Sequence, residues 1–562
     1  MTALVKKVRG GKTYYYAVRS ARVKGKPRIV WQKYLGTLDT IIRRLEGSSA
    51  PDPIETTLFE AGGVAALMQI AAKIGLVEII DSIVPKRSQG PSVGQYILLA
   101  TLNRALDPSS KSQIGDWYHN TILRRLWNHN EEHFSSQRYW DHMNMISEEH
   151  IDAIQRQIVE KVKAEFSIET ETLLYDCTNF FTYIDTHNAR NELAKRGRNK
   201  QKRNDLRQVN LALLTTSEFQ IPLFHQAYRG DIPDITHFPN VARALLDKNK
   251  ALSGKISDAT LIFDKGHLSE DNRELLLHSG IHFVAGVKSE VIPDLFETPL
   301  ESFQDSYFMP GAKFISAPIE ISARKCLAVV SYSESYFSEQ YAALTLMMKK
   351  CEEKLRALQK EVIGQALGKK RGRRSTKSVR ADVNKILSPQ HMQEIFTIDL
   401  EDYDGQPSLK YSINRKALER IIALELGRTL LITSRTEWLP VEVIRAYRSL
   451  YSVEDAFKNM KNRDYLRWQP SFHWTDQKLL VHTLYCVLAL LLSTLARKLA
   501  VEAKHDTSLT ALLDDLSAIK EVVIFYKRDD GKIDARFTVN SMTPRQKKLA
   551  DLFNIGEVLA HG

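Results

Sequence analysis

The spacing of apolar and polar residues changes along this chain, and these changes divide it into parts. Residues 1–50 are predicted to be a β module, because TYYYAVRSARV and IVWQKYLG are rich in β-branched and aromatic residues around a VKGKPR turn. Residues 51–165 carry mainly helical spacing, as in LFEAGGVAALMQIAAKIGLVEII. We therefore expect a small sheet followed by a helical domain, with a linker at GSSAPDP.

Strand patterns dominate from residue 166 to residue 294. The segments TETLLYDC, VNLALLTT and IPLFHQAY are short apolar runs, and ATLIFDKGHLSEDNRELLLHSG predicts a strand that turns into a helix before the strand IHFVAGVK. This order predicts an α/β core. The core pattern resumes over 425–500 with the strand RTLLITS and two helices, and 501–562 reads as an α+β tail.

The segment 295–424 interrupts this α/β pattern and is predicted to be an insertion domain. Alternating spacings of four and three residues form one apolar stripe there, made of Leu344, Met348, Cys351, Leu355, Leu358 and Val362. Such a stripe is typical of a helical hairpin arm or a short coiled coil. A strongly basic stretch, Gly368 to Arg380, follows it.

The most apolar run, Leu479 to Ala496, has two interpretations. Its length is borderline for a membrane span, and it carries His482 near one end, so we favour a buried core helix. The N-terminus has no apolar segment typical of a signal peptide. Four cysteines without metal-binding spacing indicate a reducing compartment, so we expect a cytoplasmic protein without a membrane anchor.

The excess of basic residues indicates what kind of partner the protein binds. The 562-residue chain has a formal net charge of +12 and a pI of about 9.2, which favours a polyanionic partner but is also seen in ribosome-associated and membrane-surface proteins. Seven of the thirteen residues from Lys195 to Arg207 are Lys or Arg. Solvated loops are the alternative interpretation of both basic stretches. The candidate nucleic-acid contacts there are Lys200, Lys202, Arg203, Arg371, Arg373 and Arg374.

Three acids occupy positions that favour chemistry. Asp176 ends the first predicted core strand, Asp264 ends a later one, and Glu454 lies on a helix after another strand. Carboxylates at strand ends of an open α/β sheet face the crevice where ligands bind. Three hard oxygen ligands suit Mg²⁺, and two such ions can assist both oxygens in the cleavage of a phosphodiester. Each aspartate taken alone is more typical of a turn.

The stretch AYRSLYSVEDAFKNMK, from Ala446 to Lys461, is predicted to be one helix. Tyr447, Glu454 and Lys461 are seven residues apart and would share a stripe, beside apolar neighbours. A charged group on a buried face is costly unless it is paired, binds a metal or meets a ligand. The alternative is an amphipathic helix with a surface glutamate and lysine.

This stretch resembles the signature helix of DDE insertion-sequence transposases, which carries Tyr, Arg, Glu and Lys at fixed spacing. Three of the four positions match, while the arginine position holds Leu450. Arg448 is the nearest arginine, about 200° away around a helix. YDCTNFF resembles the family's first aspartate motif and IFDKGHLSEDN its second. The resemblance covers most of 165–500 and implies an RNase H-like core interrupted by the insertion at 295–424.

The resemblance also implies an activity. Such enzymes cleave double-stranded DNA at terminal inverted repeats and join the 3′ ends to a target DNA, with two Mg²⁺ ions that Mn²⁺ can replace. Asp176, Asp264 and Glu454 would be catalytic metal ligands, and Tyr447, Arg448 and Lys461 would contact DNA. Synapsis of two ends implies a homodimer, associated with the bacterial nucleoid when bound to DNA. Another RNase H-like nuclease or integrase, and an inactive DNA-binding descendant, remain alternatives.

Overall fold

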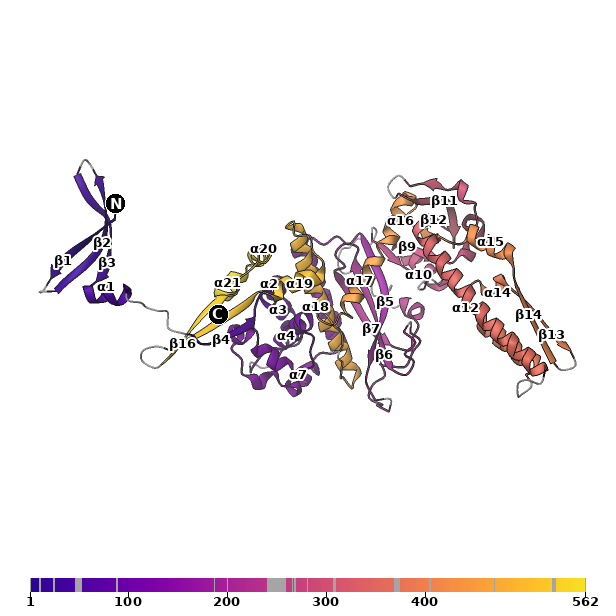
Figure 1. The fold of residues 1–562 in the computed structure, drawn as a ribbon, viewed down its shortest axis with the longest axis horizontal. Helices are drawn as coiled ribbons and strands as arrows, with labels where there is room; N and C mark the ends of the chain where they lie inside the picture. Colours follow the sequence, from indigo (N-terminus) through magenta and orange to yellow (C-terminus); the bar gives the residue numbers. More distant parts are fainter. Residues whose placement is uncertain are drawn as a thin grey trace. The chain divides into compact units, whose positions relative to one another are not determined.

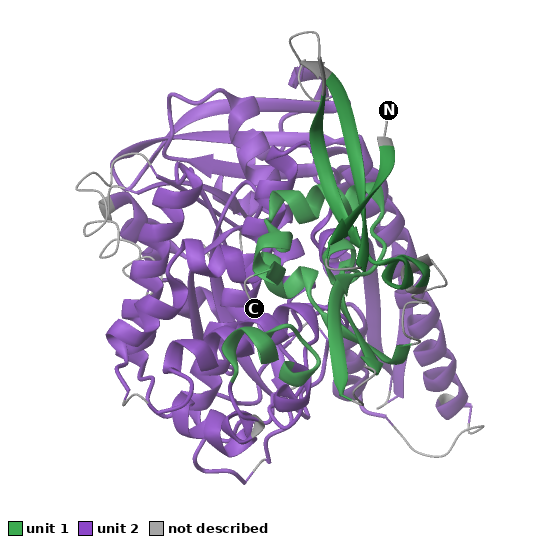
Figure 2. Ribbon diagram, turned by 90° about the vertical axis from the view of Figure 1, so that its left-hand side faces the viewer, with its two compact units in different colours: residues 1–66, 118–128, 514–562 green, residues 67–117, 129–513 purple. Residues whose placement is uncertain are grey.

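The computed structural model describes residues 2–560 except 10–11, 24–25, 46–52, 87–88, 186, 200, 240–258, 265, 267–268, 280, 307–309, 368–373, 404–405, 470 and 528–531. It divides into two compact units (Figure 2). Unit 1 consists of residues 1–66, 118–128 and 514–562, and unit 2 of residues 67–117 and 129–513. The six parts predicted from the sequence stay a prediction.

Unit 1 begins with a three-stranded antiparallel sheet in the order β1-β2-β3, followed by a short helix (Figure 1). The tyrosine-rich strand and the IVWQKYLG strand are confirmed as β2 and β3. The sequence interpretation missed β1 and the helix. The elements are β1 (Thr2–Arg9), β2 (Lys12–Val23), β3 (Lys26–Gly36) and α1 (Leu38–Leu45).

A second sheet in unit 1 joins distant parts of the sequence. β4 (Pro53–Glu60) pairs antiparallel with β16 (Lys520–Lys527), which also pairs with β17 (Ile533–Val539). An ion pair of 2.7 Å joins Arg125 to the buried carboxylate of Glu521. The C-terminal strands were predicted, but β4 lies where helix was expected. The remaining elements of this unit or its borders are α5 (Ile114–His119), α6 (Leu123–Trp127), α19 (Leu509–Ser517), α20 (Pro544–Leu552) and α21 (Ile555–Ala560).

The helical part of unit 2 packs around α18 (Asp476–Glu502). Among the described residues, α18 is long and apolar enough to cross a membrane, and the bent pair α2–α3 would be a second such span if counted as one. However, 94% of the most apolar window of α18 is buried inside the fold, which confirms a core helix. The other helices are α2 (Gly62–Lys73), α3 (Leu76–Ile83), α4 (Val93–Leu106), η1 (Glu131–Phe134), α7 (Ser136–Met143) and α8 (Glu148–Phe166).

A nine-stranded mixed sheet forms the centre of unit 2, in the order β10-β11-β12-β15-β9-β8-β5-β6-β7. β8 is parallel to both β5 and β9, and every other neighbouring pair is antiparallel. The strands are β5 (Thr172–Thr182), β6 (Arg207–Thr216), β7 (Pro222–Arg229), β8 (Thr260–Phe263), β9 (His282–Val287), β10 (Gln304–Asp305), β11 (Ala312–Ile321), β12 (Arg324–Ser333) and β15 (Arg428–Thr433). The α/β expectation is confirmed, and β10 to β12 extend the sheet into the segment predicted as an insertion.

One face of this sheet carries a continuous apolar core. Leu173 and Tyr175 of β5, Leu261 and Phe263 of β8, and Phe283 of β9 belong to it. Since side chains alternate across a strand, the intervening residues of these strands lie on the opposite face. Shorter elements beside the sheet are α10 (Glu270–Ser279), η3 (Ser289–Val291), α11 (Pro293–Phe296) and η4 (Leu300–Ser302).

The predicted apolar stripe of 344–362 lies on the long helix α12 (Glu334–Ala366), as expected. Its buried residues pack against a separate core formed with β14, α13 and neighbouring elements. The stripe therefore serves an intramolecular lobe within the described residues. The lobe also contains α13 (Thr376–Ile386), α14 (Met392–Ile395), β13 (Phe396–Tyr403), β14 (Gln406–Ile413) and α15 (Arg415–Leu424).

Candidate active site

Asp176 lies inside β5 rather than at its end, which corrects the sequence expectation. β5 continues to Thr182 because its second half pairs with β6, up to Thr182 opposite Arg207. On its other edge the pairing with β8 ends at Leu174 opposite Ile262. Asp176 is therefore the second residue beyond the β8 ladder, half-buried, and its Oδ1 accepts a 2.8 Å hydrogen bond from the Cys177 backbone.

Register places Asp264 beside Asp176. In the parallel pair β5–β8, Leu174 is opposite Ile262, and each aspartate follows its partner by two residues. Side chains two positions apart on a strand point to the same face of the sheet, and neighbouring strands lie about 4.8 Å apart. The two aspartates thus share a face, opposite the apolar core. β8 itself ends at Phe263, so Asp264 follows the strand end as predicted.

Asp176 and Asp264 occupy matching positions on neighbouring strands, and we call this line of residues the aspartate row. It continues to a glycine on the third parallel strand. Ile262 of β8 is opposite Val284 of β9, so Gly286 continues the row of Asp176 and Asp264. A Cβ atom at Gly286 would lie 2.5 Å from the hydroxyl of Tyr447 and 3.0 Å from its Cζ. The tyrosine side chain therefore occupies the space that this glycine leaves open.

The phenol of Tyr447 reaches the neighbouring aspartate. Its hydroxyl donates a 2.7 Å hydrogen bond to Oδ1 of Asp264. Burial raises the pKa of Tyr447, and the adjacent negative charge of Asp264 raises it further. The phenol consequently stays protonated at neutral pH and acts as the donor. Tyr447 comes from α16 (Pro440–Arg448), which packs on β8 and β9.

The predicted single helix over Ala446–Lys461 is wrong: α16 ends at Arg448 and α17 (Tyr451–Asn459) begins after a turn. Two serine side chains form hydrogen bonds within this turn. The Ser449 hydroxyl bonds the Ala446 carbonyl at 2.6 Å, and Ser452 bonds the Ser449 carbonyl at 2.5 Å. Such side-chain bonds compete with the helical pattern. Leu450, at the arginine position of the family, lies in this turn.

Glu454 lies exposed in the first turn of α17, which packs on β5 through its buried residues Val453, Ala456 and Phe457 (Figure 1). Within the described part of the chain, no group of three or more His, Cys, Asp or Glu side chains is arranged to hold a metal ion. The structure thus aligns the two aspartates and places Glu454 on the helix beside β5. The role of all three acids as metal ligands stays a prediction.

Lys461 ties the end of the α17 segment to β5. Its Nζ donates a 2.6 Å hydrogen bond to Oγ1 of Thr178 and lies 5.4 Å from the ring centre of Phe180. Thr178 is two residues after Asp176, so both side chains are on one face of β5. Phe180 in turn stacks on buried Trp468 with a centroid distance of 4.9 Å. Lys461 is therefore held next to the aspartate row.

Among the described residues, Arg203 and Arg374, two of the other predicted DNA contacts, form ion pairs with nearby acids. Arg203 is exposed and forms an ion pair of 2.8 Å with Asp205, and exposed Lys202 adopts a positive φ of 58° in the same loop. Arg374 pairs with Glu361 and Asp382 inside the lobe of α12. Arg448 is exposed at the end of α16. Lys200, Arg371 and Arg373 lie outside the described residues.

Two residues of the site were missed in the sequence interpretation. Gly286 interrupts the apolar strand IHFVAGVK, and a glycine inside a strand often marks the close approach of another group. Thr178 shares the period-two face of Asp176. Both signals were present in the sequence, but only the register across three strands brings these residues to Tyr447 and Lys461.

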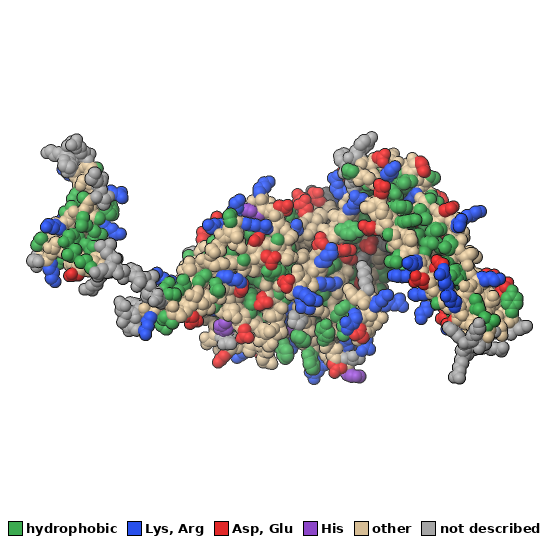
Figure 3. All heavy atoms as spheres, viewed as in Figure 1, with side chains coloured by type: hydrophobic (Ala, Val, Ile, Leu, Met, Phe, Trp, Pro, Cys, Tyr) green, Lys and Arg blue, Asp and Glu red, His purple; other side chains and the backbone are tan. Residues whose placement is uncertain are grey.

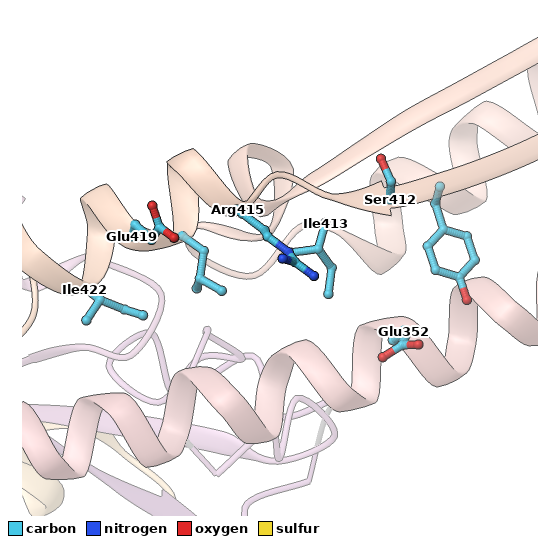
Figure 4. A pocket seen from close by; sticks show the side chains of 8 residues that line it. Glu352, Ser412, Ile413, Arg415, Glu419 and Ile422 are labelled. Atoms are coloured by element: carbon cyan, nitrogen blue, oxygen red, sulfur yellow. The ribbon is translucent and has the colours of Figure 1, made fainter.

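A pocket of about 570 Å³ lies away from this row, in the lobe of α12. Glu352 lies on α12 across from Arg415 and Glu419 of α15, and Ile413 points toward α12 (Figure 4). None of the predicted catalytic or DNA-binding residues lines it. We assign it no part in the chemistry.

No protein-family profile and no curated protein matches this sequence. Solved structures that align with the chain include a piggyBac transposase synaptic complex with hairpin DNA, at 9% identity and a TM-score of 0.36, covering 81% of this chain and 78% of that one. They also include a Mos1 transposase paired-end complex with the left transposon end, at 10% identity and a TM-score of 0.15, covering 37% and 63%. The proposals below rest on the residues of this chain.

Proposed function

We propose that this chain is a DDE transposase that cleaves the ends of a transposon and joins the resulting 3′ hydroxyls to a target DNA. The observation that carries the proposal is that Asp176 and Asp264 each lie two residues beyond the last paired residues of the parallel β5–β8 ladder, with Tyr447 bonded to Asp264 and Lys461 bonded to Thr178. In this proposal β5 to β9 form an RNase H-like core, and 295–424 is its insertion.

The residues fit a site for a hard divalent cation. Asp176 and Asp264 follow the β5–β8 ladder at matching positions and offer carboxylate oxygens, and Mg²⁺ prefers oxygen ligands that leave room for phosphate and water. Glu454 would complete the ligand set from α17. When bound, two Mg²⁺ ions would supply Lewis acidity toward the attacking and the leaving oxygen of the phosphodiester, and Mn²⁺ would substitute.

The chain's own side chains would prepare this chemistry. Tyr447 donates to Oδ1 of Asp264 and so fixes the orientation of that carboxylate. Lys461 carries a positive charge beside Thr178, where it would attract the phosphate backbone next to the cut. Positioning and electrostatic stabilisation supply most of the catalysis in phosphoryl transfer. A homodimer would bring two transposon ends together.

The test uses the purified full-length protein, labelled DNA that flanks its gene, and Mg²⁺. Asp176→Asn, Asp264→Asn and Glu454→Gln should each lower site-specific cleavage by at least about 10²-fold, as expected for lost electrostatic stabilisation. Asp455→Asn is the matched control, because this exposed neighbour of Glu454 pairs with Lys458 on the helix surface. It should cleave like the parent.

Each outcome separates one alternative. Cuts with 3′-hydroxyl ends that join a supplied plasmid establish a transposase. Metal-dependent cuts that never join a target indicate another RNase H-like nuclease. Binding of DNA without cutting, in parent and variants alike, indicates an inactive descendant, and Leu450→Arg would then be the first variant to assay for restored cleavage.

A further inference from the structure

The positive charge of this chain is concentrated at its N-terminus. Residues 1–45 contain 12 of the 79 Lys and Arg residues but only one of the 67 Asp and Glu residues, Asp39. The other 517 residues contain 67 basic and 66 acidic residues. Nearly all of the net charge of +12 therefore belongs to the segment that forms β1, β2, β3 and α1.

The two faces of this small sheet differ. Directly opposed residues of antiparallel strands lie on one face. On the first face, Val5, Tyr16 and Tyr34 form one cross-strand row, and Tyr16 and Tyr34 contact with centroids 5.2 Å apart. Val18 lies on this face and is 2% exposed, whereas Tyr34 is 52% exposed and exposed Lys7 lies 4.8 Å from the Tyr16 ring centre. We call it the tyrosine face.

The second face carries cations next to solvent. Its cross-strand rows are Thr2, Arg19 and Trp31, then Leu4, Ala17 and Lys33, with Lys6 beside Tyr15 in the next row. Lys6, Arg19 and Lys33 are exposed, Leu4 is 62% exposed, and the Arg19 guanidinium lies 5.5 Å from the Trp31 ring centre. We call it the open face. Figure 3 shows Lys and Arg side chains over this part of the chain.

We propose that the open face of β1–β3 binds the phosphate backbone of duplex DNA without regard to sequence and is the main electrostatic anchor of this protein. DNA as the polyanion rests on the function proposed above. Charge complementarity carries the argument, because a duplex carries one negative charge per about 1.7 Å of its axis and lysine and arginine release its counterions on binding. Phosphate contacts of this kind position a protein, while base contacts specify the site.

The test is the salt dependence of binding by the full-length chain to a short duplex of unrelated sequence. Each lost phosphate contact lowers the slope of log K against log salt by about 0.9, so Lys6→Gln, Arg19→Gln and Lys33→Gln together should lower it by about three. Lys504→Gln, Lys547→Gln and Lys548→Gln remove the same charge from exposed lysines elsewhere and should leave the slope near that of the parent.

A second variant guards against a sheet that fails to fold. Lys6→Arg with Lys33→Arg keeps the charge and should keep the parental slope, and circular dichroism should match for all variants. Equal slopes for the two glutamine triples overturn the proposal. So does a loss of binding to vesicles of anionic lipid, caused by the open-face triple, that leaves duplex binding unchanged.

These outcomes are independent of the proposed transposase activity. If the variant with Lys6→Gln, Arg19→Gln and Lys33→Gln shows a lower slope of log K against log salt while neither it nor the parent cuts DNA, the proposed DNA-binding face is supported and the catalytic proposal is contradicted. If the parent cuts and joins DNA while the triple keeps the full slope, the catalytic proposal stands and the anchor falls.

Discussion

The hydroxyl of Tyr447 donates a hydrogen bond of 2.7 Å to Oδ1 of Asp264, which lies 183 residues earlier in the chain. The contact joins α16 to the end of β8, at the point where Asp176 lies on the neighbouring strand. It requires Gly286 beneath the phenol, because any side chain there would overlap the Tyr447 hydroxyl. Three elements thus determine the position of one carboxylate.

Tyr447→Phe should weaken metal binding without unfolding the chain. The substitution removes only the donor to Asp264, and loss of such an outer partner typically lowers metal affinity or activity by about 10- to 100-fold. A Mg²⁺ titration of DNA cleavage should therefore shift to higher concentration. Tyr451→Phe is the control, because Tyr451 is 73% exposed on the following helix. Equal shifts for both variants would contradict the assigned role.

Gly286→Ala should act through the same tyrosine. A Cβ atom 2.5 Å from the Tyr447 hydroxyl forces the phenol away from Asp264, and overpacking of this kind typically costs about 1–3 kcal/mol. The double variant Gly286→Ala with Tyr447→Phe should lose little more cleavage than either single variant, since both remove one interaction. Cleavage rates of the four proteins form the cycle. Fully additive losses would show that the glycine acts independently.

Lys461→Ala should weaken DNA binding and reduce its salt slope by about one, as expected for one lost phosphate contact. Thr178→Val tests the position of the Lys461 side chain apart from its charge, because it removes the acceptor of the 2.6 Å hydrogen bond but keeps the lysine. It should keep the slope and lower cleavage through a less ordered lysine. A parental slope in Lys461→Ala would exclude the contact.

Local patterns were sufficient for the elements that bury apolar residues. VNLALLTT and RTLLITS became β6 and β15, because a short, mainly apolar run is typical of a buried strand, and nearly every residue of both strands is buried. The stripe from Leu344 to Val362 became α12, and the run from Leu479 to Ala496 became the buried part of α18. In each case the spacing of apolar residues carries the structural information locally.

Contacts between distant residues could not be predicted in the same way. β4 pairs with β16, so that Glu60 meets Lys520 across 460 residues, and no local pattern encodes that partner. At the site, the sequence indicated Asp176 and Asp264 separately. Their alignment depends on the register of β5 with β8, which the packing of both sheet faces determines.

The break between α16 and α17 shows that apolar spacing alone does not predict where a helix ends. Helical spacing from Ala446 to Lys461 predicts one helix, since apolar residues recur at three and four positions. Around Leu450 the backbone hydrogen bonds shorten to a three-residue spacing, and two serine hydroxyls bond carbonyls that also accept backbone N–H groups. As a result, Tyr447 and Glu454 lie on two different helices, separated by Ser449 and Leu450.

A buried polar cluster in unit 2 should make the stability of the protein depend on pH. Lys111 donates to Tyr485, whose hydroxyl also contacts His482, and His473 lies 3.1 Å from His482. Burial lowers the pKa of both histidines well below 6.5, and the nearby positive charge of Lys111 lowers it further. Both are therefore neutral in the folded protein at neutral pH.

The direction in which the free energy of unfolding changes with pH depends on how many protons the folded and the unfolded chain bind. Below about pH 6.5 the unfolded chain protonates these histidines while the folded chain does not, so the free energy of unfolding should fall by about 1.4 kcal/mol per pH unit for each histidine. Burial also lowers the pKa of Lys111, whose contribution has the same sign but declines from about pH 10.5 downward. The contribution of the two histidines is thus present above about pH 6.5 and is lost as the pH falls.

Urea unfolding at several pH values measures this slope. His473→Gln should reduce the loss of stability below pH 6.5 by the share of one proton, because one titrating group is removed from the buried cluster. His187→Gln is the control, since His187 is exposed and should leave the pH profile unchanged. A slope in His473→Gln equal to that of the parent would place the acid sensitivity elsewhere in the protein.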